Sequence, residues 1–419
     1  MNESSPPPAA GEPFSPRAVL AGRPAGRTPV GFIVGIAVTV ACAIVALGID
    51  AAQSFAAGDG AAPFALALPL ALLPVPLLVM IVLWMDRLEP EPRANLAFAF
   101  GWGAGIAALT ALIVNTANLE YVTMPRLGAS AGEYVSATFG APVVEETLKG
   151  AVLIGLLWRR RGELDGPTDG VIYAAMVGLG FAMIENVGYY VNALVSPQRG
   201  GIELLGYTFL LRGVVSPLLH PIFTSMTGLG VAYAASRRSG GKWAVALGLL
   251  AAMTLHGIWN GLSLFGTAGL VTGYLIMSCA LIVLVVILVA DRRRVIGLIR
   301  RYLPAYQRTG LVTADDVAML ASLRTRGVAR RWARAAGGHP AAAAMSDYQL
   351  AATELALACA KADRGVLGFN AFAAREHSLL TLMALARRAF NRHVPGGSEV
   401  TPAPWVESAS ALIHGDQLS

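Results

Sequence analysis

Residues 30–49 read VGFIVGIAVTVACAIVALGI, a run of twenty residues without one charged side chain. A helix of about 20 residues crosses the roughly 30 Å hydrocarbon layer of a bilayer, so this run has the length and composition of a membrane span. Comparable apolar runs lie at 62–85, 95–115, 138–158, 169–193, 204–235, 243–265 and 268–290. We therefore predict an all-α fold, a polytopic transmembrane helix bundle of about eight spans.

The charged residues are few, and they cluster between the apolar runs. Hydrophobic residues make up 55% of the chain and charged residues 14%, which is typical of membrane proteins. Basic clusters precede the first run and follow every second one: Arg17, Arg23 and Arg27; Arg87 and Arg93; Arg159 to Arg161; Arg237, Arg238 and Lys242; and Arg292 to Arg294. Because cytoplasmic loops are enriched in Lys and Arg, we predict a multi-pass protein of the cell membrane with both termini cytoplasmic. No basic stripe with interleaved aromatic residues is present, so we predict no nucleic-acid partner.

Composition also divides the chain into four parts. They are a disordered N-terminal tail at 1–29, the transmembrane domain at 30–290, a small helical cytosolic region at 291–395 and a disordered C-terminal tail at 396–419. The cytosolic region is rich in Ala, Leu and Arg with helical periodicity. Within it, Thr313 followed by Asp315 and Asp316 predicts the start of a helix.

Four consecutive predicted spans carry polar residues where hydrocarbon should surround them. They are Glu145, Glu146 and Lys149 in EETLK, Glu185 and Asn186 in FAMIEN, His220 between Pro217 and Pro221, and His256 and Asn260 in HGIWN. An ionisable group in the bilayer core costs about 2.5 to 3.5 kcal/mol on insertion scales, so such residues usually have a partner or a function. With a rise of 1.5 Å per residue, all four groups lie about 20 to 24 Å from the cytoplasmic ends of their spans. The sequence therefore predicts one shared site within the membrane.

The residue types at this level suit hydrolysis of a peptide bond. Glu145 and Lys149 are four residues apart on one helix face, and two adjacent carboxylates provide a general base for a water molecule. We predict four catalytic residues, namely Glu145, Glu146, His220 and His256. His256 and Asn260 would donate hydrogen bonds to the developing oxyanion, and His220 would hold the water or protonate the leaving amine. We predict supporting or substrate-binding roles for Lys149, Glu185, Asn186 and Asn260.

A carboxylate and two imidazoles also suit a zinc ion that keeps one open position. The predicted ligands are Glu146, His220 and His256. No cysteine spacing of a metal site occurs in the chain. At this point zinc and a metal-free mechanism with a glutamate-activated water are both open.

These motifs resemble the PrsW family of bacterial intramembrane proteases. The resemblance rests on EETLK, FAMIEN, His220 and HGIWN, with DRLEPEPR at 86–93 as a further signature, and it covers roughly residues 75–290. It implies site-one cleavage of a membrane-anchored protein, of which an anti-sigma factor is the known type, and PrsW-like proteins are commonly described as metalloproteases. The layout is also similar to the CAAX prenyl endopeptidases and their related immunity proteins, although Glu185 stands where their FxxxH motif has its histidine.

We therefore predict an intramembrane endopeptidase that cleaves a single-span membrane protein, such as an anti-sigma factor, with membrane lipid as its surroundings. Two alternatives belong to other functional classes. A proton-coupled transporter would use the same carboxylates as a relay, and an internal inverted repeat, which the sequence does not show, would favour it. A catalytically silent binding or immunity protein of the same fold would differ only in activity.

Overall fold

The computed structural model describes residues 16–20, 30–159, 161–196 and 201–393. Within these residues all regular elements are helices, which confirms the predicted all-α fold. The chain forms two compact units. One is Thr28–Leu288, and the other combines Met1–Arg27 with Val289–Ser419. The predicted disordered tails lie outside the described residues, apart from the short helix α1 (Pro16–Leu20).

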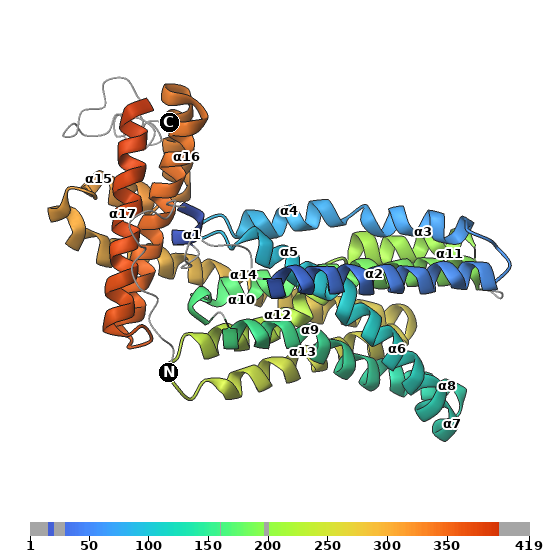
Figure 1. The fold of residues 1–419 in the computed structure, drawn as a ribbon. Helices are drawn as coiled ribbons and strands as arrows, with labels where there is room; N and C mark the ends of the chain where they lie inside the picture. The colour runs from blue at the N-terminus through green and yellow to red at the C-terminus, as the bar shows by residue number, and fades with distance from the viewer. Residues whose placement is uncertain (1–15, 21–29, 160, 197–200, 394–419) are drawn as a thin grey trace, which may run out of the picture. The chain divides into compact units, whose positions relative to one another are not determined.

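The first unit is a bundle of long apolar helices (Figure 1). Seven helical segments of the described chain are long and apolar enough to cross a membrane: Val30–Ala56, Ala62–Met85, Arg93–Leu127, Pro167–Val195, Ile202–Ala235, Lys242–Ser263 and Gly266–Thr309. They correspond to seven of the eight predicted runs. The remaining run contains α9 (Ala141–Arg159), whose 19 residues include two glutamates and a lysine near its start. The polytopic helix bundle predicted from the sequence is confirmed.

Several of these segments consist of more than one helix. The elements are α2 (Val30–Ala56), α3 (Ala62–Leu72), α4 (Val75–Met85), α5 (Arg93–Trp102), α6 (Ala108–Asn118), α7 (Met124–Leu127), α8 (Ala129–Val135), α10 (Pro167–Val195), α11 (Ile202–Phe209), α12 (Leu219–Ala235), α13 (Lys242–Ser263) and α14 (Gly266–Tyr302). Short π-helical turns interrupt or join some of them, among them Ser136–Gly140 directly before α9 and Leu210–Val215 after α11.

Helix α10 is the centre of the bundle, because nearly all of it is buried and it packs on α12, α5, α3, α2 and α9. Glycines permit the closest approaches. A Cβ atom at Gly178 would lie 2.6 Å from the backbone nitrogen of Pro221, and one at Gly180 would lie 2.0 Å from the carbonyl oxygen of Phe100. Small residues of this kind allow helix backbones in a membrane to come together. The contact at Gly178 brings the beginning of α12, and with it His220, against α10.

The span that contains His220 is broken beside that residue. Its first part ends at Val215, and α12 begins at Leu219. Pro217 and Pro221 lie at the break and lack the backbone N–H groups that a continuous helix would use. The span is therefore interrupted at these two prolines, and His220 lies in the first turn of a new helix.

The second unit contains α15 (Ala314–Leu320), α16 (Leu323–Asp363) and α17 (Phe369–His393). The predicted helix start is correct, because Thr313 Oγ1 accepts a hydrogen bond from Asp316 N at 3.1 Å and Asp316 Oδ2 accepts one from Thr313 N at 2.9 Å. Helices α16 and α17 pack along each other, and α1 packs on both. The guanidinium of Arg375 on α17 donates to the carbonyl oxygens of Val19 and Leu20 at the end of α1.

Candidate active site

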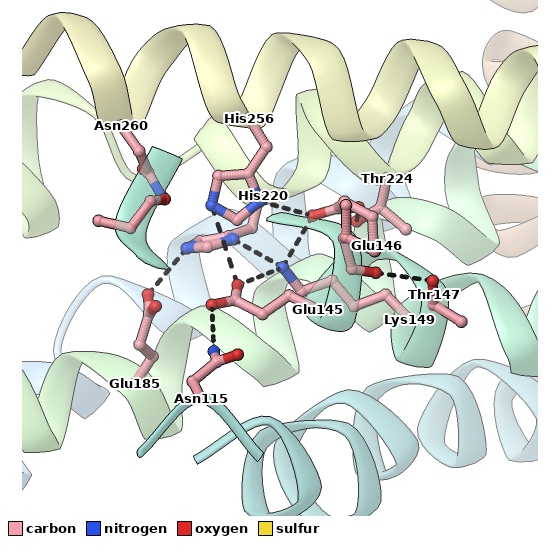
Figure 2. Close-up of polar contacts among 12 residues, drawn as sticks. Asn115, Glu145, Glu146, Thr147, Lys149, Glu185, His220, Thr224, His256 and Asn260 are labelled. Atoms are coloured by element: carbon pink, nitrogen blue, oxygen red, sulfur yellow. Dashed lines mark hydrogen bonds and ion pairs between the residues drawn. The ribbon is translucent and has the colours of Figure 1, made fainter. Parts of the chain in front are cut away.

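The first turns of α9 place two carboxylates and a lysine at the centre of the bundle. Lys149 Nζ donates to Glu146 Oε1 at 2.9 Å and to Glu145 Oε2 at 3.2 Å. The side chains of Lys149 and Glu146 are 0% exposed. Lys149 Nζ also lies 3.7 Å from the centre of the Phe181 ring, a cation–π contact with α10. The spacing in EETLK therefore produces the buried charge cluster expected from the sequence (Figure 2).

His256 on α13 lies against both carboxylates. Its Nδ1 is 3.0 Å from Glu146 Oε1, and its Nε2 is 3.9 Å from Glu145 Oε2. The imidazole stacks on Phe223 of α12, with 4.7 Å between ring centroids. Gly257 explains how α13 comes so near, because a Cβ there would lie 2.6 Å from the carbonyl oxygen of Thr138 in the turn before α9.

His220 connects the lysine to Glu185 on α10. Its Nδ1 is 2.9 Å from Lys149 Nζ, and its Nε2 is 2.9 Å from Glu185 Oε2. An ammonium group only donates hydrogen bonds, so Nδ1 is the acceptor, and the ring proton resides on Nε2 and points to Glu185. Glu185 thus occupies a position from which it orients the imidazole.

The two asparagines assigned from the motifs lie beside this cluster. Asn186 Oδ1 accepts a 2.7 Å hydrogen bond from Nε of Arg212, whose Nη2 forms an ion pair with Glu185. Asn260 Nδ2 donates to the carbonyl oxygen of Ala137 at 3.0 Å. In this structure Asn260 therefore supports the π-helical turn before α9, and its amide is directed at the backbone.

The carboxylates of Glu145, Glu146 and Glu185 each have a polar partner that lies outside the sequence motifs. Asn115 Nδ2 on α6 donates to Glu145 Oε1 at 3.2 Å, and Thr224 Oγ1 on α12 donates to Glu146 Oε2 at 3.0 Å. Arg212, in the π-helical turn Leu210–Val215, is the partner of Glu185. The only sequence signal for Asn115 is a polar residue at the end of an apolar run, and Thr224 lies one helical turn after His220.

Glu145, His220 and His256 form a group that fits a metal ion. One ligand atom each from Glu145, His220 and His256 lies within 4.8 Å of the other two. The predicted carboxylate ligand, Glu146, lies next to this group, and its two oxygens already accept hydrogen bonds from Lys149, His256 and Thr224.

The chemistry of the group suits zinc, because one carboxylate and two imidazoles leave a fourth position open. Carboxylates also hold the far ring nitrogens, as is usual for metal-binding histidines: Glu146 faces His256 Nδ1, and Glu185 faces His220 Nε2. Lys149 Nζ is bound to His220 Nδ1 here, so the lysine must release that nitrogen before it can bind a metal.

Comparisons with known proteins agree with these residues. The sequence model of the PrsW family, described as intramembrane metalloproteases, matches residues 91–290. The protein named Protease PrsW of Oceanobacillus iheyensis is 32% identical over 127 residues, which are 30% of this chain and 54% of that protein. Protease PrsW of Geobacillus kaustophilus is 30% identical over 140 residues, 33% of this chain and 56% of that protein. The chain thus spans about half the length of these curated relatives.

No solved structure matches the chain. The family match begins before α5 and ends within α14, so it contains Glu145, Lys149, Glu185, His220 and His256 with the helices that carry them. The motifs that suggested the resemblance therefore coincide with the buried network. The part of this chain that holds the site, residues 91–290, is therefore similar to the PrsW family.

Proposed function

We propose that this protein is an intramembrane endopeptidase that hydrolyses a peptide bond of a membrane-anchored protein. The convergence of Glu145, His220 and His256 carries the proposal. These residues come from three helices of a membrane bundle and lie within 4.8 Å of one another. Their family and the names of its curated members support the same activity.

Glu145 is the residue best placed to activate water. Both oxygens of Glu146 are occupied by Lys149, His256 and Thr224, whereas Glu145 Oε2 has one close partner, Lys149, and faces His256 Nε2 at 3.9 Å. In the reaction Glu145 takes a proton from water, the water oxygen bonds to the carbonyl carbon, and the C–N bond breaks as the leaving amine receives that proton.

The neighbouring residues keep the reacting groups in place. Glu146 holds His256 and Lys149, and Glu185 holds His220. Lys149 balances the negative charge of the two adjacent carboxylates. His256, whose Nε2 faces Glu145, supports the negative charge that develops on the carbonyl oxygen. A zinc ion held by Glu145, His220 and His256 would supply Lewis-acid activation of water and carbonyl; Glu145 would then be a metal ligand, and its role as the base belongs to the metal-free reaction.

The substrate we propose is a single-span membrane protein, with an anti-sigma factor as the type that the family resemblance implies. A site enclosed by membrane helices is reached through lipid, so a membrane-anchored chain is the substrate class that suits it. Within the network, Glu145, Glu146 and Lys149 are at most 5% exposed.

We also propose that both termini are cytoplasmic. Helix α1 precedes the first span and α15 to α17 follow the last, yet all belong to one compact unit. Both ends must then lie on the same side, so the chain crosses the membrane an even number of times. The seven apolar segments together with α9 give eight crossings, and the arginine clusters favour the cytoplasmic side.

The experiment compares wild-type protein with Glu145→Gln in detergent, using a panel of single-span membrane proteins as substrates. Glu133→Gln, an exposed glutamate of α8, is the matched control. We expect cleavage by the wild type and the control and none by Glu145→Gln, at equal level of folded protein. Metal content is measured by mass spectrometry in the same samples, and sensitivity to a chelator tests for zinc. Cleavage by Glu145→Gln would refute the assignment, and a wild type that cleaves nothing would favour a transporter or a silent binder.

A further inference from the structure

Asn115 is a polar residue that directly follows the apolar stretch Ala111–Val114 of α6, outside every motif that identifies the site. It lies on α6, where its neighbours Ile113 and Val114 are exposed on the surface of the bundle. Its own side chain turns inward, and Nδ2 lies 3.2 Å from Glu145 Oε1 (Figure 2). Among the described residues outside α9, only Asn115 forms a hydrogen bond with Glu145, and only His256 forms an ion pair with it.

This contact fixes the direction of the amide. A carboxylate oxygen accepts hydrogen bonds, so the NH2 group of Asn115 must face Glu145 and its carbonyl oxygen must point away. That oxygen, Oδ1, is buried and has no hydrogen-bond partner among the described residues. A buried polar atom without a partner costs about 1 to 3 kcal/mol. An apolar residue at position 115 would avoid that cost. The hydrogen bond to Glu145 therefore explains why an asparagine stands there.

The contact also completes the support of the Glu145 carboxylate. Lys149 holds Oε2, and Asn115 holds Oε1 from a different helix. Two partners on opposite oxygens fix the plane of the carboxylate, whereas Lys149 alone would leave it free to rotate. The fixed plane keeps Oε2 directed at His256.

We propose that Asn115 is a positioning residue for Glu145, which holds this carboxylate in the orientation that water activation and metal binding require. The inference rests on the proposed function. Asn115 acts through the hydrogen bond that it donates, because the volume of its side chain alone would not orient the carboxylate.

The test uses three variants of the full chain in detergent. Asn115→Ala removes the amide, and Asn115→Asp keeps the shape but loses the donor. Asn118→Ala is the control, because Asn118 lies on the same helix and donates to Ser136 Oγ at 3.2 Å, away from Glu145. Zinc binding without substrate is measured by competition with a chromogenic chelator, and kcat and KM are measured with a single-span protein that the wild type cleaves.

We expect both Asn115 variants to bind zinc about 10-fold more weakly or worse, as for other residues that orient metal ligands. Their kcat should fall by about 10-fold or more with KM within about 2-fold, and Asn118→Ala should match the wild type in both measurements. If the wild type cleaves without zinc, the comparison of kcat values alone decides the test. Near wild-type behaviour of Asn115→Asp, or equal losses in Asn115→Ala and Asn118→Ala, would overturn the assignment. A wild type that neither binds zinc nor cleaves would overturn the proposed function and this assignment together.

Discussion

Lys149 Nζ and His256 Nδ1 both bind one oxygen of Glu146, Oε1, at 2.9 and 3.0 Å. Glu146 is therefore the structural anchor of the charge cluster, while Glu145 beside it has fewer hydrogen-bond partners. Removing one partner of a buried ion pair leaves a charge without compensation. We expect Glu146→Gln to lower stability by about 3 kcal/mol or more, and Glu145→Gln to lower it clearly less. Thermal unfolding of both variants in detergent checks this, and equal losses would contradict the assignment of roles.

Lys149 is the cation that two carboxylates share. We expect Lys149→Met to destabilise the protein by about 3 to 5 kcal/mol, because it leaves both glutamates in a buried place without a positive charge. Combining it with Glu146→Gln removes one of those charges. The double variant should then be less damaged than the sum of the two single variants. Additive losses in unfolding experiments would show that the lysine and Glu146 do not interact.

Gly257 allows α13 to lie against the turn before α9. A Cβ there would lie 2.6 Å from the carbonyl oxygen of Thr138, so Gly257→Ala must push His256 away from Glu146 or strain the turn. We expect a loss of about 1 to 3 kcal/mol in stability and a strong fall in cleavage. Gly155→Ala on α9 is the control, since no atom lies within 4 Å of its added Cβ. Full activity of Gly257→Ala would mean that the close approach is not needed.

Asp86, in the loop after α4, makes stability depend on pH. Burial raises its pKa from the usual 3.8 to about 8; the nearby charge of Asp169 adds to the rise, and a hydrogen bond from Glu91 N opposes it. The folded protein thus binds this proton more tightly than the unfolded chain, so Asp86 lowers stability increasingly as pH rises from about 4 to about 8. Asp86→Asn should become more stable relative to wild type over this range and keep a constant advantage above it. Melting temperatures between about pH 5 and about pH 9 test this, with exposed Asp59→Asn as control.

Within the second unit, Arg375 of α17 holds the end of α1 by hydrogen bonds. It donates to the carbonyls of Val19 and Leu20 and pairs with Glu354 at 2.7 Å, as a cation at a helix C-terminus should. We expect Arg375→Ala to expose the segment and to speed trypsin cleavage at Arg17 several-fold. Arg388→Ala, an exposed arginine of the same helix, should leave the rate unchanged. Equal rates in all three proteins would argue against the contact.

The sequence predicts the helices well, because apolar runs, prolines and charged clusters act locally. EETLK, the proline-flanked histidine and HGIWN identify Glu145, His220 and His256 as candidates for one site, and in the structure one ligand atom of each lies within 4.8 Å of the other two. The sequence does not decide whether Glu145 or Glu146 joins the two histidines. Neighbouring residues on a helix point about 100° apart, and the packing of α9 sets its rotation. The roles of Asn115 and Thr224 cannot be predicted from the sequence for the same reason, because the packing of α6 and α12 decides which way their side chains face.

The contact between α1 and Arg375 has a consequence for biosynthesis. Leu20 and Arg375 are 355 residues apart in the chain. At about 5 to 20 residues per second, the ribosome reaches the arginine roughly 20 to 70 seconds after it has made α1. All the spans are translated in that interval, so the segment at Pro16–Leu20 must wait undocked, available to chaperones and proteases, until translation of the last helices supplies the surface on which it docks.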